Sequence, residues 1–449
     1  MSREPDKHGE GPASQSPSDP RLPAPGTHSL PPLSLYIHIP WCARKCPYCD
    51  FNSHNAPQVL PQDDYVDALL HDLDQDLPLA QGRPLASIFF GGGTPSLFAP
   101  DRIARILDGV ASRLSVPDGT EITLETNPGT VEHGPFADYR RAGVNRISFG
   151  VQSFDDAALQ RIGRIHDAAQ AERAVQQAQD AGIDNLNLDL MYALPQQTLA
   201  GAIDDIDKAL ALRTPHLSHY QLTLEPNTPF AAKPPPLPDD DLASDMQDEC
   251  QARIAAAGLA QYEVSAYSRP SRQCVHNLNY WNFGDYLGIG AGAHGKITSV
   301  ADREPEAGEQ IRDNAALPAT GFRLPAIGLQ IRRRWKVRTP RGYLDLAATA
   351  RRVGGDDRIA DAQLPFEYML NALRLNAGFA LDLFSATTGL PATAIAAHID
   401  AAITRGWLEI GDNRIRASAF GRRFLNDVIA AFLPERGSEP RSHGGPPHD

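Results

Sequence analysis

Three of the five cysteines lie within eight residues of one another, at Cys42, Cys46 and Cys49. Their spacing, CxxxCxxC, puts three thiolates on one short segment, and thiolates are the usual protein ligands of iron–sulfur clusters. Three ligands can hold three irons of a [4Fe–4S] cubane and leave the fourth iron open, much as a catalytic zinc site keeps one position open. The spacing predicts a metal centre with room for another molecule.

A structural zinc site is the alternative for these cysteines. Zinc usually takes four protein ligands, and the other two cysteines, Cys250 and Cys274, lie far along the chain. No histidine pair has zinc-finger spacing, although His38 or His54 is near enough in sequence to add a ligand. An odd number of cysteines in a long chain without a secretory signal argues against disulfides and favours a reducing, cytoplasmic compartment.

The elements that would carry these residues are short apolar runs alternating with amphipathic stretches between residues 35 and 295. We expect strands at residues 35–39, 87–90, 121–125, 146–151, 186–191 and 219–224. Between them we expect helices at 65–73, 103–114, 136–142, 168–181 and 202–212. This alternation indicates parallel βαβ units. Six such units predict an α/β fold, a full or partial (β/α) barrel of the TIM type, although periodicity does not exclude a doubly wound sheet.

Polar residues follow five successive expected strands. The cysteine segment follows the first, residues 91–94 (GGGT) follow the second, Glu125 ends the third, Gln152 follows the fourth and Asp189 lies near the end of the fifth. In a (β/α) barrel these positions meet at the carboxyl-terminal end of the strands, where such folds place their sites. The glycines do not continue as GxGxxG, so they give no dinucleotide-binding fingerprint.

The overall composition limits the classes of partner. The chain has 449 residues, 42% hydrophobic and 22% charged, with a net charge of -13. An acidic chain lacks the basic face that sequence-independent nucleic-acid binding needs, so we expect no nucleic-acid partner. No apolar run reaches the roughly 18 residues of a membrane span, which leaves only peripheral membrane contact open.

Outside the barrel, expected over residues 33–298, we expect disordered tails at 1–32 and 434–449 and an insertion at 299–327. Residues 328–433 are assigned to a C-terminal domain with helices at 343–352, 365–375 and 393–405. Strands at 407–410 and 415–417 and a helix at 419–432 complete it. This order suggests a small, winged-helix-like α+β unit. The acidic charge favours a packing or lid role for it over DNA binding.

The CxxxCxxC segment resembles the cluster motif of the radical S-adenosylmethionine (SAM) superfamily. The similarity extends to the coproporphyrinogen III oxidase-like branch of that superfamily. It is carried by residues 36–42 (YIHIPWC), 90–96 (FGGGTPS), 125–128 (ETNP), 148–153 (SFGVQS), 161–166 (RIGRIH) and 187–191 (NLDLM). The resemblance is close over residues 35–295 and looser beyond. It implies a [4Fe–4S] cluster on the three cysteines and SAM on its open iron.

The resemblance also implies which residues contact SAM. Glycines would let the strand-end backbone approach the methionine part of SAM, and carboxylates suit its ammonium and ribose hydroxyl groups. The implied residues are Tyr36, Tyr48, Gly92, Gly93, Thr94, Glu125, Gln152, Arg164 and Asp189. Taken singly, a helix cap for the threonine and surface ion pairs for the charged residues are the ordinary alternatives.

Two features discriminate within the branch. Its oxygen-independent oxidases extend the motif to CxxxCxxCxC, whereas the last position here is Phe51. Phenylalanine at this position resembles the HemW group, the haem chaperones of the branch. Residues 276–281, with the pattern HNxxYW, look like the haem-binding signature of that group.

The resemblance implies haem binding by His276, Asn277, Tyr280 and Trp281. A neutral imidazole is a good axial ligand for haem iron, neighbouring aromatic rings can cover a porphyrin, and Asn277 would orient the ring of His276. A core histidine packed beside aromatic residues is the alternative. Cys274 is a ligand, a covalent attachment point or a buried thiol, and the sequence does not separate these.

Two functions follow from the resemblance. The first is a haem chaperone that passes haem to an acceptor protein, with a one-electron donor such as flavodoxin or ferredoxin for the cluster. The second is a radical SAM enzyme, either an oxygen-independent coproporphyrinogen III oxidase or a radical methyltransferase. Phe51 and the HNxxYW pattern favour the chaperone, and the fold by itself does not decide.

Overall fold

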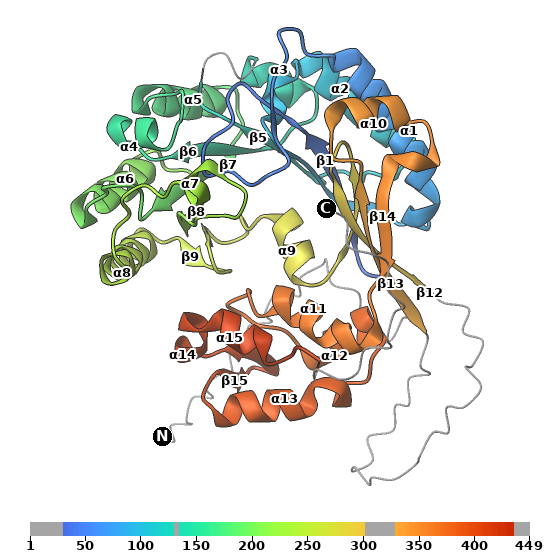
Figure 1. Cartoon of the computed structure of the whole chain (residues 1–449), viewed down its shortest axis with the longest axis vertical. Helices are drawn as coiled ribbons and strands as arrows, with labels where there is room; N and C mark the ends of the chain where they lie inside the picture. The colour runs from blue at the N-terminus through green and yellow to red at the C-terminus, as the bar shows by residue number, and fades with distance from the viewer. Residues whose placement is uncertain (1–29, 130–133, 301–327, 435–449) are drawn as a thin grey trace, which may run out of the picture. The chain divides into compact units, whose positions relative to one another are not determined.

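The structure, a computed structural model, describes residues 30–129, 134–300 and 328–434 (Figure 1). Nearly all of the expected tails and of the expected insertion lie outside the described residues. No helix in the described ranges is long and apolar enough to cross a membrane.

The described residues form one twelve-stranded sheet in the order β14-β13-β12-β11-β1-β4-β5-β6-β7-β8-β10-β9. At its centre, neighbouring strands pair in parallel. They are β1 (Leu33–Ile39), β4 (Leu85–Gly92), β5 (Glu121–Thr126), β6 (Arg146–Gln152), β7 (Asn185–Tyr192) and β8 (His216–Gln221). The two ends of the sheet, β14 and β9, do not pair with each other, so the predicted partial barrel is confirmed. Five of the expected strands overlap closely; the sixth begins three residues earlier than expected.

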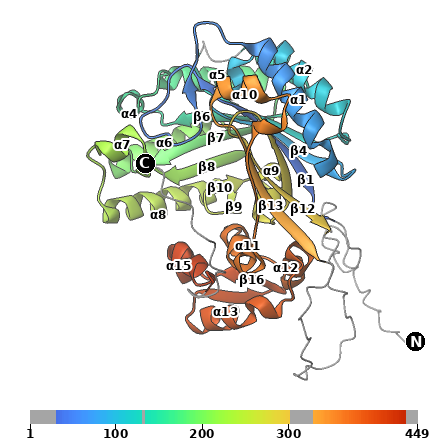
Figure 2. The ribbon, with the colours of Figure 1, turned by 45° about the vertical axis from the view of Figure 1, so that its right-hand side comes forward.

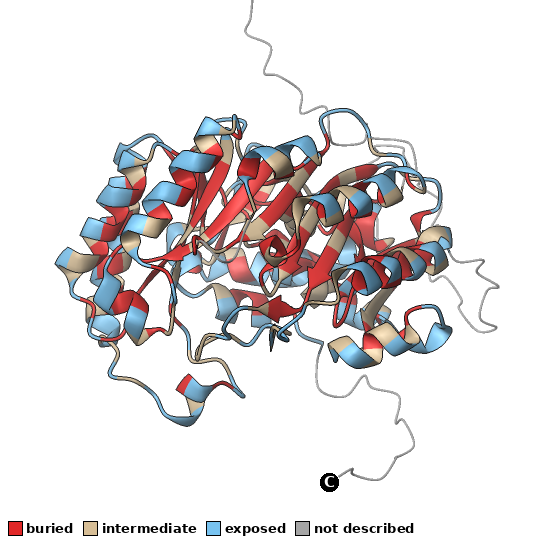
Figure 3. Ribbon diagram, turned by 90° about the horizontal axis from the view of Figure 1, so that it is seen from above, coloured by how far each residue is buried: buried red, intermediate tan, exposed pale blue. Residues whose placement is uncertain are grey.

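The sequence of β1 shows why these strands form. Leu33, Leu35, Ile37 and Ile39 share one apolar core with residues of the outer helices, whereas Tyr36 and the other even positions face the interior of the barrel. This alternation is the two-residue period of a strand. The strands are buried and the outer faces of the helices exposed (Figure 3).

The outer layer consists of helices that follow the strands in order. They are α1 (Gln62–Ala80), α2 (Pro100–Ala111), α3 (Phe136–Arg141), α4 (Asp156–Arg161), α5 (Ala168–Asp180), α6 (Leu199–Ala211), α7 (Pro229–Ala232) and α8 (Asp240–Ala256), with η1 (Pro95–Leu97) before α2. A capping box between Asp167 and Gln170 starts α5, because each side chain satisfies a backbone N–H group that the helix leaves free. The sequence did not predict α4, α7 and α8.

Further strands extend both edges of the sheet. On one edge are β11 (Asp285–Ile289), β12 (His294–Val300), β13 (Leu329–Lys336) and β14 (Val353–Arg358); on the other are β10 (Ala266–Ser268) and β9 (Ala260–Gln261). The expected domain boundary near residue 328 thus falls inside the sheet. Strand β13 contains three consecutive arginines, so it has no apolar run by which the sequence could predict it. These arginines form ion pairs with acidic residues such as Asp356 and Glu367. Near these strands lie α9 (Val275–Trp281), α10 (Pro340–Leu346) and η2 (Ala350–Arg352).

The C-terminal residues build a second hydrophobic core, which includes Tyr368, Phe379 and Phe384 and is joined by Phe283 and by Ile331 of β13. Their elements are η3 (Asp361–Gln363), α11 (Leu364–Ala372), α12 (Leu381–Thr388), α13 (Thr393–Thr404), β15 (Leu408–Gly411), β16 (Arg414–Ala417), α14 (Ala419–Arg423) and α15 (Leu425–Ala430). Helices α11, α13 and α15 surround the β15–β16 hairpin (Figure 2). The order of helices and hairpin follows the expectation, except that α12 is additional and the last helix is broken at Phe424.

Candidate functional site

The cysteine loop begins where β1 ends and is closed by the short parallel pair β2 (Trp41–Cys42) and β3 (His54–Asn55). All three cysteines of the loop line one cavity of about 290 Å³ at the carboxyl-terminal end of the strands. The parallel strands bring residues from five other segments to the same cavity. This is the end of the barrel at which the sequence predicts the site.

Polar groups surround the three sulfur atoms. Arg164 donates from Nη1 to the Sγ of Cys46 at 3.5 Å, and Ser53 Oγ lies 3.9 Å from the Sγ of Cys49. Burial raises the pKa of Cys42 to about 11, against a hydrogen bond from Thr94 that lowers it. Three half-buried thiols that share one cavity with hydrogen-bond donors fit an iron–sulfur cluster, whose binding would release the thiol protons.

The donor set fits zinc less well. His38, a candidate fourth ligand, has both ring nitrogens engaged, by the Tyr36 hydroxyl at 3.0 Å and the Asn52 carbonyl oxygen at 2.9 Å. In the described part of the chain, no three His, Cys, Asp or Glu side chains converge on a position for a single metal ion. In a cubane, each thiolate binds a different iron, so the three sulfurs need not converge on one ion.

Glycines at the end of β4 allow the cluster loop to approach the barrel. A Cβ atom on Gly93 would lie 2.5 Å from the backbone oxygen of Trp41, and one on Gly92, whose φ is +111°, would lie 2.4 Å from the His38 ring. These contacts are too close for any side chain. The structure thus gives the glycines a second role beside the predicted approach to SAM: they seat the cysteine loop.

Two carboxyl groups, Glu125 and Asp189, lie half-buried in the wall of the cavity. Burial and then the neighbouring Asp189 raise the pKa of Glu125 to about 8. The pKa of Asp189 is also raised by burial, although Asn187 at 2.8 Å and Ser148 at 3.1 Å donate to it. The two carboxyl groups can bind hydroxyl groups and a cationic ligand, because either would replace the water contacts that the carboxyl groups lose on burial.

Gln152 and Arg164 line the wall beside the carboxyl groups. Gln152 has a φ of +71°, uncommon for a residue other than glycine, and its Oε1 accepts a hydrogen bond from the Tyr220 hydroxyl at 2.9 Å. Arg164 also donates to the Gly150 carbonyl oxygen at 2.6 Å and to Asn127. The backbone of Gln152 and the side chains of Gln152 and Arg164 are therefore held in place at the wall of the cavity.

The cavity gathers nearly all of the residues that the sequence assigns to SAM. Those that line it are Tyr48, Gly92, Gly93, Thr94, Glu125, Gln152, Arg164 and Asp189. Tyr36 does not, because its ring faces inward from β1 and packs against Phe89 one layer deeper. Sequence analysis missed Ser148, Asn127 and Tyr220. Ser148 lies four residues before Gln152 on β6, so the two-residue period of the strand was an available signal for it.

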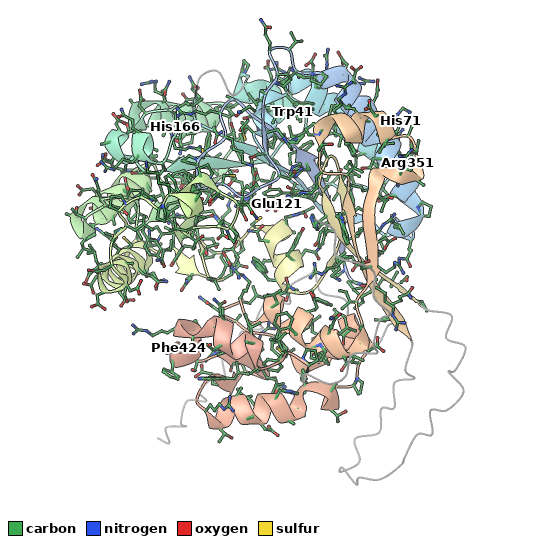
Figure 4. All side chains as sticks on the ribbon, in the orientation of Figure 1. Trp41, His71, Glu121, His166, Arg351 and Phe424 are labelled. Carbon is green, nitrogen blue, oxygen red and sulfur yellow. The ribbon has the colours of Figure 1, made fainter. Side chains whose placement is uncertain are left out.

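The predicted haem-binding residues lie elsewhere, on α9. This helix packs against β4 and β1, and Glu121 holds its start by accepting from the His276 amide at 3.1 Å and from the Cys274 thiol at 3.5 Å. Cys274 is buried, and burial raises the pKa of its thiol to about 12. Of the three roles that the sequence leaves open for Cys274, the structure shows a buried thiol. In Figure 4, Trp41 marks the cluster loop and Glu121 marks the surroundings of α9.

A hydrogen-bond chain fixes the tautomer of His276. Ser87 Oγ donates to Ser34 Oγ at 2.8 Å, so it must accept from the Nδ1–H of His276, 2.9 Å away. Ser34 also accepts from Asn279 at 3.0 Å. Among the residues that the structure describes, the Nε2 atom of His276 is buried without a hydrogen-bond partner, and burial lowers the pKa of the ring to about 3. The imidazole is therefore neutral, with a free lone pair on Nε2.

Aromatic rings surround this imidazole: Phe89 at 4.8 Å, Tyr280 at 5.4 Å and Tyr36 at 6.4 Å between ring centroids. The side chain at Nδ1 is Ser87, not the expected Asn277. Ser34 and Ser87 lie near the first residues of their strands, whereas the cysteine loop follows the last residue of β1. At 3.3 Å per residue, about 15–20 Å of strand separates the two sites.

Comparisons with known proteins agree with this geometry. Residues 36–209 match the radical SAM superfamily and residues 359–424 match the HemN C-terminal domain. The chain is 46% identical over 406 residues to the "Heme chaperone HemW" of Escherichia coli K12, covering 90% of this chain and 99% of that protein. It is 45% identical over 410 residues to the protein of the same name from Haemophilus influenzae, with coverage of 90% and 99%.

Among solved structures, the coproporphyrinogen III oxidase (HemN) from Escherichia coli, a radical SAM enzyme, matches with a TM-score of 0.70. Its sequence identity is 21%, and the match covers 90% of both chains. At that identity the likeness shows the fold alone, and it confirms the predicted barrel. The two curated relatives, matched over almost their whole length, show the narrower family. The chain belongs to the HemW family of the radical SAM superfamily.

Proposed function

We propose that the chain is a haem chaperone, which binds haem through His276 and transfers it to an acceptor protein. Its identity of 46% to a "Heme chaperone HemW" supports this function. The observation that carries it is the state of His276: a neutral imidazole with its Nδ1 proton held by Ser87 and a free lone pair on Nε2. A second ring nitrogen held by a hydrogen bond is the usual arrangement of a metal-binding histidine.

The ordinary alternative is a histidine with a purely packing role, and His166 and His219, also buried, each have one ring nitrogen without a partner among the described residues. His276 differs from them because it lies in the HNxxYW segment beside Tyr280 and Trp281. Buried polar atoms nearly always have hydrogen-bond partners, and exceptions require a reason. Ser34 and Ser87 hold only the Nδ1 side of the ring. A core histidine could have had a second hydrogen-bond partner at Nε2, but the described residues provide none. Haem iron would supply the missing partner, and Tyr280 and Trp281 on the same helix would flank the porphyrin.

The His276 ring is enclosed, with only 4% of the residue exposed. Coordination through Nε2 therefore requires the start of α9 to move relative to β5 and the Phe89 ring to turn away, while Nδ1 keeps its hydrogen bond to Ser87. The hydrogen bonds to Glu121 are the contacts that such a shift would break first, because they join the start of α9 to β5. Haem uptake is thus coupled to movement of a seven-residue helix.

At the other end of the barrel, Cys42, Cys46 and Cys49 would hold the [4Fe–4S] cluster and the cavity wall would hold SAM. When bound, this pair supplies one-electron reductive cleavage of SAM. The residues of the chain bind and orient: Glu125 and Asp189 would face hydroxyl and ammonium groups of SAM, and Arg164 lies against Cys46.

The partners follow from this function. An acceptor protein for haem and a one-electron donor such as flavodoxin or ferredoxin are proposed, with the cytoplasm as the compartment. Phe51, at the position of the fourth cysteine of the oxidases, is 61% exposed at the cavity. An apolar side chain there cannot act as a ligand, which supports the chaperone over the oxidase.

A haemin titration followed by the Soret band tests the proposal. We expect His276→Ala to weaken binding at least tenfold, because it removes the imidazole that would bind the haem iron. His398→Ala, which removes an exposed histidine from α13, is the matched control and should bind as the unmodified protein does. Equal affinities of all three proteins would refute the assignment. Anaerobic conversion of coproporphyrinogen III to a decarboxylated product would favour the enzyme instead.

A further inference from the structure

Three buried polar atoms that have no hydrogen-bond partner in the described part of the chain lie on α9 or against it: His276 Nε2, Trp281 Nε1 and Arg374 Nε. The first two belong to the HNxxYW segment. The third comes from the residues after α11, in the region that matches the HemN C-terminal domain. Such atoms are rare in folded proteins because each carries a desolvation cost. Their grouping around one helix suggests that a ligand supplies the partners.

Arg374 lies directly on the motif. Its guanidinium carbon is 4.7 Å from the centre of the Trp281 ring. The adjacent backbone is fixed to the edge of the barrel, since Leu375 forms a β-bridge with Glu263 and the Asn376 amide donates to the Tyr262 carbonyl oxygen at 3.0 Å. The arginine is therefore positioned by two elements and does not project freely into solvent.

Three other cations near α9 are already neutralised. Arg333, close to Tyr280 and Tyr286, is paired with Glu367. Lys296 and Arg83 are both paired with Asp285 at 2.8 and 2.7 Å. Arg374 forms no ion pair with the residues that the structure describes; its acidic neighbour Glu263 interacts only at longer range and accepts hydrogen bonds from its own loop.

Haem carries the carboxylate groups with which this arginine could pair. It is a flat aromatic ring with two propionate carboxylates at one edge, and an arginine fork binds a carboxylate through two parallel hydrogen bonds. His276 and Trp281 are five residues apart, about 7.5 Å along the axis of α9 and about 140° around it, so the two side chains leave different faces of the helix. A haem bound at the histidine would pass along the side of α9 for its acidic edge to meet the arginine.

We propose that Arg374 binds a propionate carboxylate of the haem held at His276, so that the C-terminal domain supplies part of the haem site. This inference rests on the proposed function. The competing explanation is purely structural: stacking of a guanidinium on an indole ring is itself worth about 0.5–2 kcal/mol. The two explanations differ in whether the effect of the arginine depends on the carboxylates of the ligand.

Soret titrations with haem and with haem dimethyl ester separate them, because esterification removes the charge of both propionates and leaves the ring and the iron. We expect Arg374→Gln to weaken haem binding about tenfold, the scale of a lost charge-assisted hydrogen bond. Arg374→Lys should recover part of that loss. For the dimethyl ester, both variants should bind as the unmodified protein does.

Arg405→Gln is the matched control, since Arg405 also stacks on a tryptophan of the same domain, at 5.0 Å from the ring of Trp407, but is exposed. It should change neither titration. An equal loss of affinity for both ligands in Arg374→Gln would show a structural role and overturn the proposal, and so would an unchanged affinity for haem. If His276→Ala loses haem while Arg374→Gln does not, the inference fails and the proposed function stands; if neither loses haem, both fail.

Discussion

The two ends of the barrel differ in how accessible their proposed binding residues are. At the carboxyl-terminal end of the strands, a cavity of about 290 Å³ keeps cysteines and carboxyl groups available to a ligand. At the other end, α9 fills the space, and the histidine proposed to bind haem is enclosed by aromatic rings. One site is open and needs its ligands to complete it; the other is closed and must open.

The difference lies in what holds each site. The open end is built on glycines and strand ends, whose positions follow from the backbone of the barrel and do not depend on occupancy. The closed end depends on a few side-chain hydrogen bonds: Ser87 to His276, and Glu121 to the start of α9. Each such bond contributes only about 0.5–1.5 kcal/mol, so a ligand with a strong iron–nitrogen bond can displace those to Glu121 while Ser87 keeps its hydrogen bond to Nδ1 of His276.

The largest expected effect concerns the open end alone. Cys46→Ala should reduce iron and sulfide from about four of each per chain to near zero after anaerobic reconstitution, since three thiolates are the minimum set. Cys250→Ala, which changes a buried cysteine of α8, should retain full content. Haem binding should be unchanged in both variants, because no residue of α9 lines the cavity. Unchanged iron content in Cys46→Ala would contradict the cluster assignment.

A tenfold effect is expected at the closed end. Ser87→Ala removes the group that holds the Nδ1 proton of His276, and loss of such a partner typically weakens metal binding by about 10–100-fold. The Soret titration measures it, with Ser112→Ala at the end of α2 as an exposed control. Cluster content should stay normal. A loss of cluster in Ser87→Ala would show that the two ends are coupled.

A smaller, pH-dependent effect is expected for SAM. The pKa of Glu125, about 8, leaves it largely protonated at pH 7, and a carboxylate accepts hydrogen bonds from hydroxyl and ammonium groups better than a carboxylic acid. SAM affinity of the reconstituted protein should therefore rise up to about tenfold between pH 7 and pH 9. In Glu125→Gln the profile should be flat; an equal rise in that variant would exclude Glu125 as the cause.

The same carboxyl group makes a prediction for stability. Its pKa is raised from 4.5 to about 8 on folding, so between these values the folded chain holds a proton that the unfolded chain releases. Stability is therefore lost as the pH rises through that window. Denaturant unfolding of the ligand-free protein should show Glu125→Gln gaining stability relative to the unmodified chain from pH 5 to pH 8. A constant difference would contradict the buried, protonated state.

Much of the open end could be predicted because its signals are local. CxxxCxxC lies within one loop, and the polar residues occupy the same place after successive strands, a pattern that the geometry of parallel βαβ units converts into proximity. Tyr36 was the exception, because which face of β1 it occupies depends on register. The strands β12 to β14 were missed because charged side chains paired across strands conceal their periodicity.

The sequence by itself determined the family and the barrel, and it predicted the three cluster cysteines and the haem-binding histidine. Tertiary structure alone decided that α9 lies at the far end of the barrel, that Ser87 holds a histidine 189 residues away, and that Arg374 of the C-terminal domain covers Trp281. The physical reason is the separation along the sequence: the spacing of side chains on a loop or strand depends only on residues that are neighbours in the sequence. A contact between distant segments depends on how the whole sheet brings them together.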